Sequence, residues 1–259
     1  MMSKSLFDLS GRVAVVTGGT TGLGHAIALG LAGAGADVVA SSRRLEQVEK
    51  TAAEIEALGR RSLRVSSDVL NRASLVALHD AVLQEFGKVD ILVNAAGVTH
   101  KAPTLEEDEA NWSRVIETNL TGTLRACQIF GATMVKAGYG RIVNIASLTS
   151  FVGFFQVAAY SASKAAVASL TKVLAVELAR TGVNVNAIAP GMFPTELNAK
   201  LITGTPRGEE LHMRVPMGRF GEAHELAGAA IFLSSQAASY VTGEIVAVDG
   251  GFLASGVNR

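Results

Sequence analysis

Short runs rich in β-branched and other apolar residues alternate with segments of helical periodicity along all 259 residues of the chain. Such runs are typical of strands covered on both faces, because a strand with one wet face would alternate apolar and polar residues. They predict strands at residues 12–17, 37–41, 63–67, 89–93, 141–146, 183–189 and 245–248. The unbroken alternation of strands and helices predicts an α/β fold, in which a doubly wound parallel sheet carries helices on both faces.

The size and charge of the chain limit its organisation and its partners. Its length suits one large domain, so we expect residues 1–259 to form a single unit. Charged residues make up 18% of the chain, against an average of about 25%, so we expect oligomerisation to cover surplus apolar surface. Lysine plus arginine and aspartate plus glutamate both number 23, which leaves no excess positive charge for a nucleic-acid partner.

Targeting and metal-binding patterns are also missing from the sequence. The N-terminus lacks the apolar segment of a signal peptide and no apolar run reaches membrane-spanning length, so we expect a cytoplasmic protein without a membrane partner. Cys127 is the single cysteine and lies in an apolar helical pattern, so we expect it to fill the core. The histidines show no H-x-x-x-H spacing, so we expect no metal site.

A glycine-rich turn follows the first predicted strand and precedes a helical pattern at 25–34. Glycines let the backbone approach a pyrophosphate, and a helix N-terminus offers it unpaired N–H groups. The spacing is G-x-x-x-G-x-G rather than G-x-G-x-x-G, and tight packing without a ligand would also explain the glycines. The flanking strand and helix favour a dinucleotide site. Its predicted contacts here are Gly18, Thr20, Thr21, Gly22, Leu23 and Gly24.

The second predicted strand ends in Ser42, Arg43 and Arg44. An NAD site usually has an acidic residue at this point to bind the ribose 2′-hydroxyl, and this chain has none. A hydroxyl and two guanidinium groups suit a 2′-phosphate instead. The sequence therefore favours NADP over NAD, although both arginines could also begin a solvated helix.

The carboxyl ends of three further strands carry the remaining candidate cofactor contacts. In parallel α/β sheets, ligands bind outside these ends. Asp68 could contact the adenine or cap the helix predicted at 71–86. Asn94 could brace the crossover, and the small residues after it leave room for a cofactor. The candidate contacts are Asp68, Val69, Asn94, Ala95, Ala96, Gly97, Pro190, Gly191 and Thr195.

Ser147 ends the fifth predicted strand, and Tyr160 and Lys164 follow on a helix predicted at 158–180. Residues four apart share one helix face. A phenol with a pKa of about 10 is a poor acid or base at neutral pH. An ammonium about 4 Å away stabilises its phenolate by roughly 4 kcal/mol at an effective dielectric constant of about 20, which lowers the pKa by roughly three. Taken alone, the pair would more often be two solvated side chains.

Six motifs in a fixed order change that assessment. They are T-G-x-x-x-G-x-G at 17–24, N-A-A-G at 94–97, Asn119, Ser147, Y-x-x-x-K at 160–164 and P-G at 190–191. Over nearly the whole chain this series resembles the short-chain dehydrogenase/reductase family. The resemblance implies a Rossmann-like sheet and an oxidoreductase acting on a secondary alcohol or a ketone.

The resemblance also implies a role for each catalytic candidate. Tyr160 is the expected general acid/base, Lys164 is expected to lower its pKa and bind the nicotinamide ribose, and Ser147 is expected to orient the substrate oxygen. Asn119, in the middle of the helix predicted after residue 111, is expected to hold a water that passes the proton through Lys164. Taken alone, a buried Asn there would indicate a local distortion or a bound water. The family is commonly tetrameric, so we expect a homotetramer.

The substrate is less strongly specified. Residues 144–147, 185–190 and 216–221 are similar to the gluconate and deoxygluconate dehydrogenase branch. The irregular segment at about 192–216 is expected to form a lid over the pocket. Four cations could meet a sugar-acid carboxylate, although each could instead be a solvated surface charge: His100, Lys101, Arg207 and Arg214. The alternatives are an activity like that of 3-oxoacyl-carrier-protein reductases and a non-catalytic relative that senses the cofactor.

Overall fold

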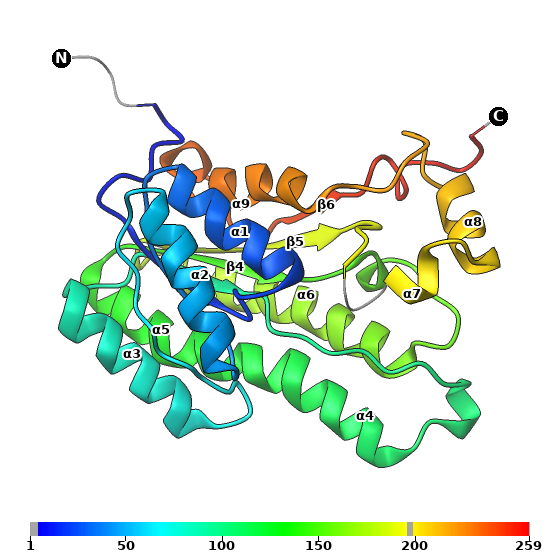
Figure 1. The fold of residues 1–259 in the computed structure, drawn as a ribbon, viewed down its shortest axis with the longest axis horizontal. Coiled ribbons are helices and arrows are strands. Elements are labelled where there is room, and N and C mark those ends of the chain that lie inside the picture. The colour runs from blue at the N-terminus through cyan, green and yellow to red at the C-terminus, as the bar shows by residue number, and fades with distance from the viewer. Residues whose placement is uncertain (1–4, 196–198, 259) are drawn as a thin grey trace.

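The computed structural model describes residues 5–195 and 199–258, which form a parallel six-stranded sheet in the order β2-β1-β3-β4-β5-β6 (Figure 1). The sheet with helices on both faces confirms the predicted fold class. Its strands are β1 Val13–Thr17, β2 Asp37–Ser41, β3 Ile91–Asn94, β4 Gly140–Ile145, β5 Val183–Pro190 and β6 Ile245–Val248.

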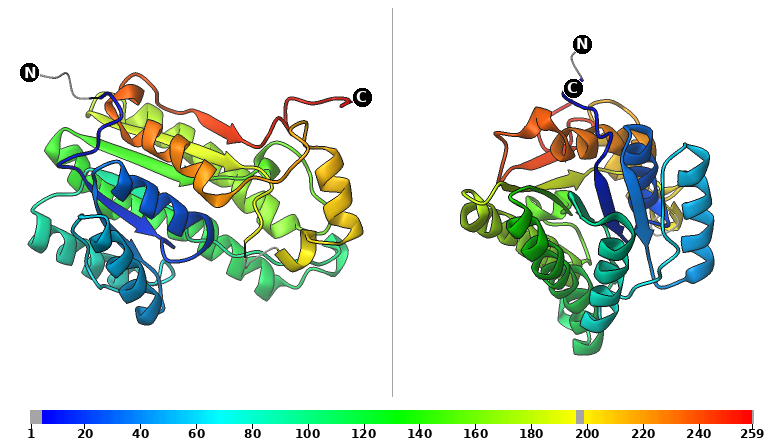
Figure 2. Two further views of the ribbon diagram at one scale, coloured as in Figure 1. Left: turned by 45° about the horizontal axis from the view of Figure 1, so that its top comes forward. Right: turned by 90° about the vertical axis from the view of Figure 1, so that its left-hand side faces the viewer.

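Helices cover both faces of this sheet (Figure 2). Each face of the sheet has its own hydrophobic core. Alternate residues of β1 belong to different cores, because successive side chains on a strand point to opposite faces. Ala14 and Val16 pack in one core with α1, α2 and α9, and Val13 and Val15 pack in the other with α3, α5 and α6. The helices are α1 Gly22–Gly33, α2 Leu45–Ala57, α3 Arg72–Phe86, α4 Glu109–Ile116, α5 Gly122–Ala137, α6 Ala158–Leu178, α7 Ala199–Ile202, α8 Pro206–Met213 and α9 Ala227–Ser234.

The register aligns the carboxyl ends of neighbouring strands. Thr17 of β1 pairs with both Ser41 of β2 and Asn94 of β3, and Asn94 pairs with Asn144 of β4. The loops that follow these strands therefore leave the sheet at one edge. Helices α7 and α8 lie beyond the same end of β5 (Figure 1).

The predicted third strand at 63–67 is wrong, and the described residues form six strands rather than seven. The segment runs beside β2, but the backbone hydrogen bonds between them lie at the two ends of the segment. The N–H of Val38 donates to the carbonyl of Arg61 over 3.0 Å, and the N–H of Ser67 donates to the carbonyl of Ser42 over 3.0 Å. Between these points the Ser41 hydroxyl donates to the Val65 carbonyl over 2.7 Å. A side-chain bond thus replaces the backbone ladder at the edge of the sheet.

The helix predicted after residue 111 is interrupted where a distortion was expected. A π-helical turn, Glu117–Thr121, joins α4 to α5 and contains the fully buried Asn119. Such turns are rare and frequently lie at functional sites. The distortion allows Asn119 to face the loop that follows β3.

The N-terminus of α3 tests one of the two roles predicted for Asp68, which did not exclude one another. Asn71 caps this helix, because its Oδ1 accepts from Ala73 over 2.9 Å and from Ser74 over 3.3 Å. The prediction that Asp68 caps α3 is wrong; its Oδ1 instead accepts from Leu70 over 3.0 Å.

A small separate core lies over the carboxyl edge of the sheet. Ile202 of α7 and Leu211 of α8 pack there with Leu148, Val215 and Phe252. Residues 196–198 of the predicted lid lie outside the described part of the chain. Within the described ranges, four 3₁₀ turns complete the fold: Thr104–Glu106, Leu148–Ser150, Ala223–Leu226 and Gln236–Ala238.

Candidate active site

A cavity of about 560 Å³ runs along the carboxyl edge of the sheet, from the glycine-rich turn to α8. The structure brings most of the predicted site residues together in its wall. Asn94 and Asn119 are the two that do not line it. The predicted residues that do are Gly18, Thr20, Thr21, Gly22, Leu23, Gly24, Ser42, Arg43, Arg44, Asp68, Val69, Ala95, Ala96, Gly97, Ser147, Tyr160, Lys164, Pro190, Gly191 and Thr195.

The glycine-rich turn is packed so closely that side chains would not fit. A Cβ added to Gly18 would lie 2.6 Å from the backbone of Ala96, and one added to Gly24 would lie 2.2 Å from the carbonyl oxygen of Gly18. Thr21 precedes α1 without a side-chain cap, so the first N–H groups of this 12-residue helix are not satisfied by its N-cap side chain. Bare backbone and a helix N-terminus facing a cavity fit the pyrophosphate of a dinucleotide.

The end of β2 presents positive charge to the same cavity. Arg43 and Arg44 are exposed, and within residues 5–195 and 199–258 neither forms an ion pair with an acidic side chain. Beside them, the Thr20 hydroxyl donates to Ser42 over 2.8 Å, which joins the glycine-rich turn to the end of β2. Two free guanidinium groups next to a hydroxyl fit a phosphate on the adenosine ribose.

Ser147 and Tyr160 face one another from a strand end and a helix. Ser147 lies two residues after the end of β4 and caps a 3₁₀ turn, its Oγ accepting from Thr149 over 3.2 Å. Tyr160 lies in the first turn of α6 and keeps part of its surface accessible. Burial raises the pKa of Tyr160, and a hydrogen bond with Ser147 acts in the opposite direction. The phenol is therefore protonated at neutral pH.

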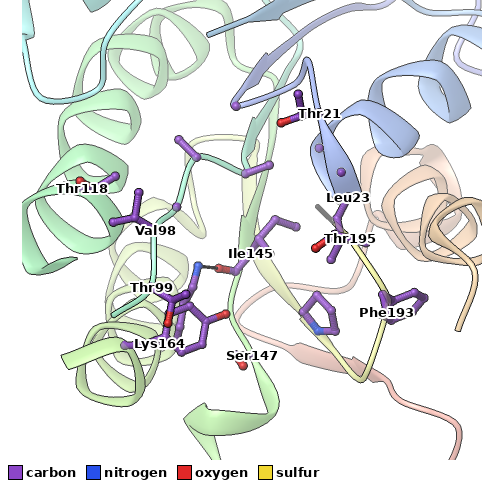
Figure 3. Close-up of a pocket in the computed structure, with 18 of the residues that line it drawn as sticks. Thr21, Leu23, Val98, Thr99, Thr118, Ile145, Ser147, Lys164, Phe193 and Thr195 are labelled. Atoms are coloured by element: carbon purple, nitrogen blue, oxygen red, sulfur yellow. Dashed lines mark hydrogen bonds between the residues drawn. The ribbon is translucent and has the colours of Figure 1, made fainter. Parts of the chain in front are cut away.

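Lys164 lies one helical turn beyond Tyr160 and is almost completely buried, with 5% of its surface exposed. Its Nζ donates to the carbonyl oxygen of Ile145 over 2.6 Å (Figure 3). Burial lowers the pKa of Lys164 to about 8. Because burial dominates the environment of both groups and the ammonium bonds to the end of β4, the lowering of the Tyr160 pKa by Lys164 stays a prediction.

Asn119 positions the loop that forms the floor of the cavity. Its Oδ1 accepts from the N–H of Val98 over 2.8 Å, and its Nδ2 donates to the Val98 carbonyl and the Ser163 hydroxyl, both over 3.0 Å. A Cβ added to Gly97 would lie 3.4 Å from Asn119 Oδ1 and 3.7 Å from Lys164 Nζ. Because both N–H groups of the amide are used, the proton relay through this residue stays a prediction that would depend on Oδ1.

Asn94 faces the interior of the sheet rather than the cavity. Its Nδ2 donates to Asn144 Oδ1 over 2.9 Å and to Cys127 Sγ over 3.3 Å, and Asn144 in turn donates to Thr171 over 2.9 Å. The network ties β3 and β4 to α5 and α6, which agrees with the bracing role considered for Asn94. Burial raises the pKa of Cys127 to about 12, as expected for a thiol that fills the core.

Comparisons with known proteins match nearly the whole chain. The model of a family described as enoyl-(acyl carrier protein) reductase matches residues 18–253. The 2-dehydro-3-deoxy-D-gluconate 5-dehydrogenase of Dickeya dadantii is 41% identical over 254 residues, which cover 98% of this chain and all of that protein. This chain belongs to the short-chain dehydrogenase/reductase family.

Other members of the family show how its substrates vary. The D-threitol dehydrogenase of Mycolicibacterium smegmatis is 43% identical over 95% of this chain and 94% of its own length. The crystal structure of a gluconate 5-dehydrogenase from Burkholderia cenocepacia in complex with NADP and tartrate has a TM-score of 0.93 and 37% identity, covering 96% of this chain and 98% of that one.

Several residues that line the cavity of this short-chain dehydrogenase/reductase were not predicted from the sequence. Arg114 lines the cavity from α4. Thr118 of the π turn and Thr99 of the loop after β3 line it as well (Figure 3). The spacing of four between Arg114 and Thr118 could have indicated a shared face. Which face meets the cavity depends on the π turn, which has no marker in the sequence beyond Asn119.

Of the four cations expected near the substrate, the cavity wall contains Arg207. Lys101 is exposed outside the wall, and the Arg214 guanidinium lies 4.9 Å from the centre of the Phe252 ring. His100 faces Glu107 across a 2.7 Å contact. None of these three residues lines the cavity, which agrees with the alternative that each is a charge outside the site. Separately, none of the described helices is both long and apolar enough to cross a membrane.

Proposed function

We propose that this protein is an NADP(H)-dependent oxidoreductase that interconverts a secondary alcohol and a ketone in a sugar acid such as gluconate. One observation carries the proposal: Ser147, Tyr160 and Lys164 line the same cavity as the glycine-rich turn and the two arginines after β2. A dinucleotide held along the glycine-rich turn would extend toward these three side chains.

Each of the three groups has a role that its environment supports. When bound, the nicotinamide ring gives or accepts the hydride. Ser147 orients the reacting oxygen, and the hydroxyl of Tyr160 gives a proton to that oxygen or takes one from it. The raised pKa keeps Tyr160 protonated, which is the form required to protonate a ketone oxygen during reduction. With a pKa of about 8, Lys164 can itself exchange protons near neutral pH.

NADP is favoured by the charge around the end of β2. A 2′-phosphate placed there would meet Arg43 and Arg44, neither of which is held by an acidic residue in the described part of the chain. The Burkholderia cenocepacia relative was solved with NADP, which supports the same choice. Asp68 also lies in the cavity wall, and we propose that it contacts the adenine of the bound cofactor.

The sugar-acid substrate is supported mainly by relatives. Several curated relatives at about 40% identity carry the names 2-dehydro-3-deoxy-D-gluconate 5-dehydrogenase and gluconate 5-dehydrogenase. The segment at about 192–216 is proposed as the substrate lid because α8 contributes Arg207 and Leu211 to the cavity.

An activity on acyl substrates like that of 3-oxoacyl-carrier-protein reductases is the second candidate. The part of the cavity beside Ser147 also has apolar walls, formed by Phe154, Val157, Met192 and Phe193. These side chains would suit an acyl chain better than a row of hydroxyl groups. A non-catalytic cofactor sensor is less well supported, since it would not need the Tyr160 hydroxyl in the cavity.

The assembly and its location belong to the same proposal. Val173 and Val176 lie exposed on α6, and Trp112 is exposed on α4, which supports pairing of copies through these helices into a homotetramer. Light scattering coupled to gel filtration would measure the mass of the assembly, and a monomer would contradict it. Fractionation would test the expected cytoplasmic location.

A substrate panel tests the activity. The purified protein is assayed for interconversion of NADP⁺ and NADPH with D-gluconate, with D-threitol and with a 3-oxoacyl thioester, and each assay is repeated with NAD(H). We expect the sugar acid with NADP(H) to give the highest kcat/KM. Preference for the thioester would favour the second candidate, and no turnover with any of the three would contradict the proposed enzyme.

A further inference from the structure

We propose that the guanidinium of Arg207 binds the carboxylate group of the substrate, so that one cation on α8 selects sugar acids over neutral polyols. The inference rests on the proposed oxidoreductase function and names the group that sets its substrate class. It starts from the distribution of charge in the cavity wall.

The two ends of the cavity differ in whether a carboxylate lines them. Asp68 is the one carboxylate among the described lining residues, and it follows Ser67, whose N–H bonds to the end of β2 at Ser42. It therefore lies at the adenosine end, beside Arg43 and Arg44. At the end formed by Ser147 and α8, the described wall holds Arg207 and no carboxylate. An anionic group on a substrate is attracted there without competition from a carboxylate in the described wall.

The guanidinium of Arg207 has most of its hydrogen-bonding capacity left. Its Nη1 donates to the carbonyl oxygen of Phe155 over 3.1 Å, and no ion pair joins it to an acid within residues 5–195 and 199–258. Arginine has five N–H donors in a planar fork that matches the two oxygens of a carboxylate. The bond to Phe155 therefore fixes the group and leaves a bidentate edge for a ligand.

Local packing holds α8 in place behind this side chain. Thr205 caps the helix by accepting from Gly208 over 3.0 Å, and Pro206 occupies its first turn. A Cβ at Gly208 would lie 1.7 Å from the Ile202 carbonyl oxygen, so α7 and α8 meet backbone to backbone. Four residues after Arg207, Leu211 enters the same small core as Leu148. Arg207 is thus positioned relative to Ser147, the neighbour of Leu148.

Three neighbouring cations are committed elsewhere, and a fourth, Arg114 of α4, donates to Asn111 over 3.2 Å. His100 faces Glu107, whose side chain is 5% exposed, and Arg214 stacks on Phe252. The ammonium group of Lys164 donates its hydrogen bond to the Ile145 carbonyl at the bottom of the cavity. Arg207 therefore differs from these residues in combining a place in the wall, partial exposure and an unpaired charge.

The test compares D-gluconate with D-gluconamide, which replaces the carboxylate by a neutral group of similar shape. For Arg207→Gln we expect KM for D-gluconate to rise about 100-fold with little change in kcat, because a charge-assisted pair that holds substrate and transition state equally is lost. The KM for D-gluconamide should stay within about threefold. Arg207→Lys should recover part of the affinity, since it keeps the charge but not the fork.

Arg214→Gln is the matched control, because it removes one positive charge from the end of the same helix but outside the cavity. It should leave both KM values unchanged. If Arg207→Gln weakens D-gluconate and D-gluconamide equally, or weakens neither, the inference is wrong. If Arg214→Gln raises the KM for D-gluconate as much as Arg207→Gln does, the inference is also wrong, because loss of any positive charge near the cavity would then explain the weaker binding.

A binding measurement separates failure of this inference from failure of the proposed function. Calorimetry with the NADPH-loaded protein reports D-gluconate binding whether or not turnover occurs. If the protein binds D-gluconate without turning it over and Arg207→Gln weakens that binding, the carboxylate site stands and the proposed reaction is wrong. If binding is absent, or is equal in wild type and variant, the carboxylate site is wrong.

Discussion

The Nζ atom of Lys164 lies 5.8 Å from the centre of the Tyr160 ring and makes its hydrogen bond to the Ile145 carbonyl. The two side chains share one face of α6, but burial acts on both more strongly than they act on each other. It raises the pKa of the phenol and lowers that of the ammonium to about 8. The two pKa values therefore lie further apart than those of a free tyrosine and a free lysine, and in the opposite order, so the phenol holds its proton more tightly than the ammonium does.

The lowered pKa of Lys164 predicts a pH dependence of stability. Between pH 8 and the ordinary lysine pKa of 10.5, the unfolded chain holds a proton at this position that the folded chain has lost. The free energy of unfolding of the wild type, relative to Lys164→Met, should therefore rise with pH across this window, by on the order of 3 kcal/mol in total. Below about pH 8 this difference should be flat.

Chemical denaturation at several pH values between 7 and 10 measures this difference. Lys172→Met is the control, because Lys172 lies exposed on the same helix. A wild-type stability that falls relative to Lys164→Met as the pH rises would show that the ammonium is stabilised rather than penalised by its site.

Two glycines of α1 separate cofactor binding from helix stability. Gly24→Ala should abolish NADPH binding, since its Cβ would lie 2.2 Å from the Gly18 carbonyl oxygen and would push the glycine-rich turn apart. Gly33→Ala, at the other end of the helix, meets no atom within 4 Å. It should keep binding and add about 0.5–1 kcal/mol to stability. Fluorescence titration with NADPH measures the first effect and thermal denaturation the second; equal affinities of the two variants would contradict this packing argument.

The arginines after β2 should set the choice of cofactor. Replacing both Arg43 and Arg44 by Gln should raise KM for NADP about 100-fold and leave KM for NAD nearly unchanged, because only NADP carries the 2′-phosphate. Arg64→Gln serves as control, since Arg64 lies near the same edge of the sheet but pairs with Glu56 and does not line the cavity. The prediction fails if both cofactors lose affinity to the same extent.

Much of this site could be predicted because the carboxyl ends of parallel strands meet at one edge. Residues as far apart in sequence as Gly18, Ser147 and Pro190 line one cavity for that reason. Motif order then distinguished Tyr160 and Lys164 from an ordinary pair on a solvated helix.

What could not be predicted depends on burial and on local geometry. The sequence does not reveal how deeply Lys164 and Tyr160 are desolvated, so the effect of burial on their pKa values could not be predicted. It also does not reveal that a serine bond replaces a strand ladder at 63–67 or which face of α4 carries Arg114. Similarly, only the packing of α8 distinguishes Arg207 from Arg214.

The most direct measurement is the initial rate of NADPH formation from NADP⁺ and D-gluconate by wild type and Tyr160→Phe, with NADPH affinity determined for both. Tyr139→Phe is the control, because Tyr139 stacks between Arg12 and Arg141 and does not line the cavity. We predict that Tyr160→Phe retains the affinity and loses about 10³-fold in rate, since the phenol moves the proton, whereas Tyr139→Phe keeps both. A Tyr160→Phe variant that matches the wild-type rate would contradict the assignment of Tyr160 as the acid/base.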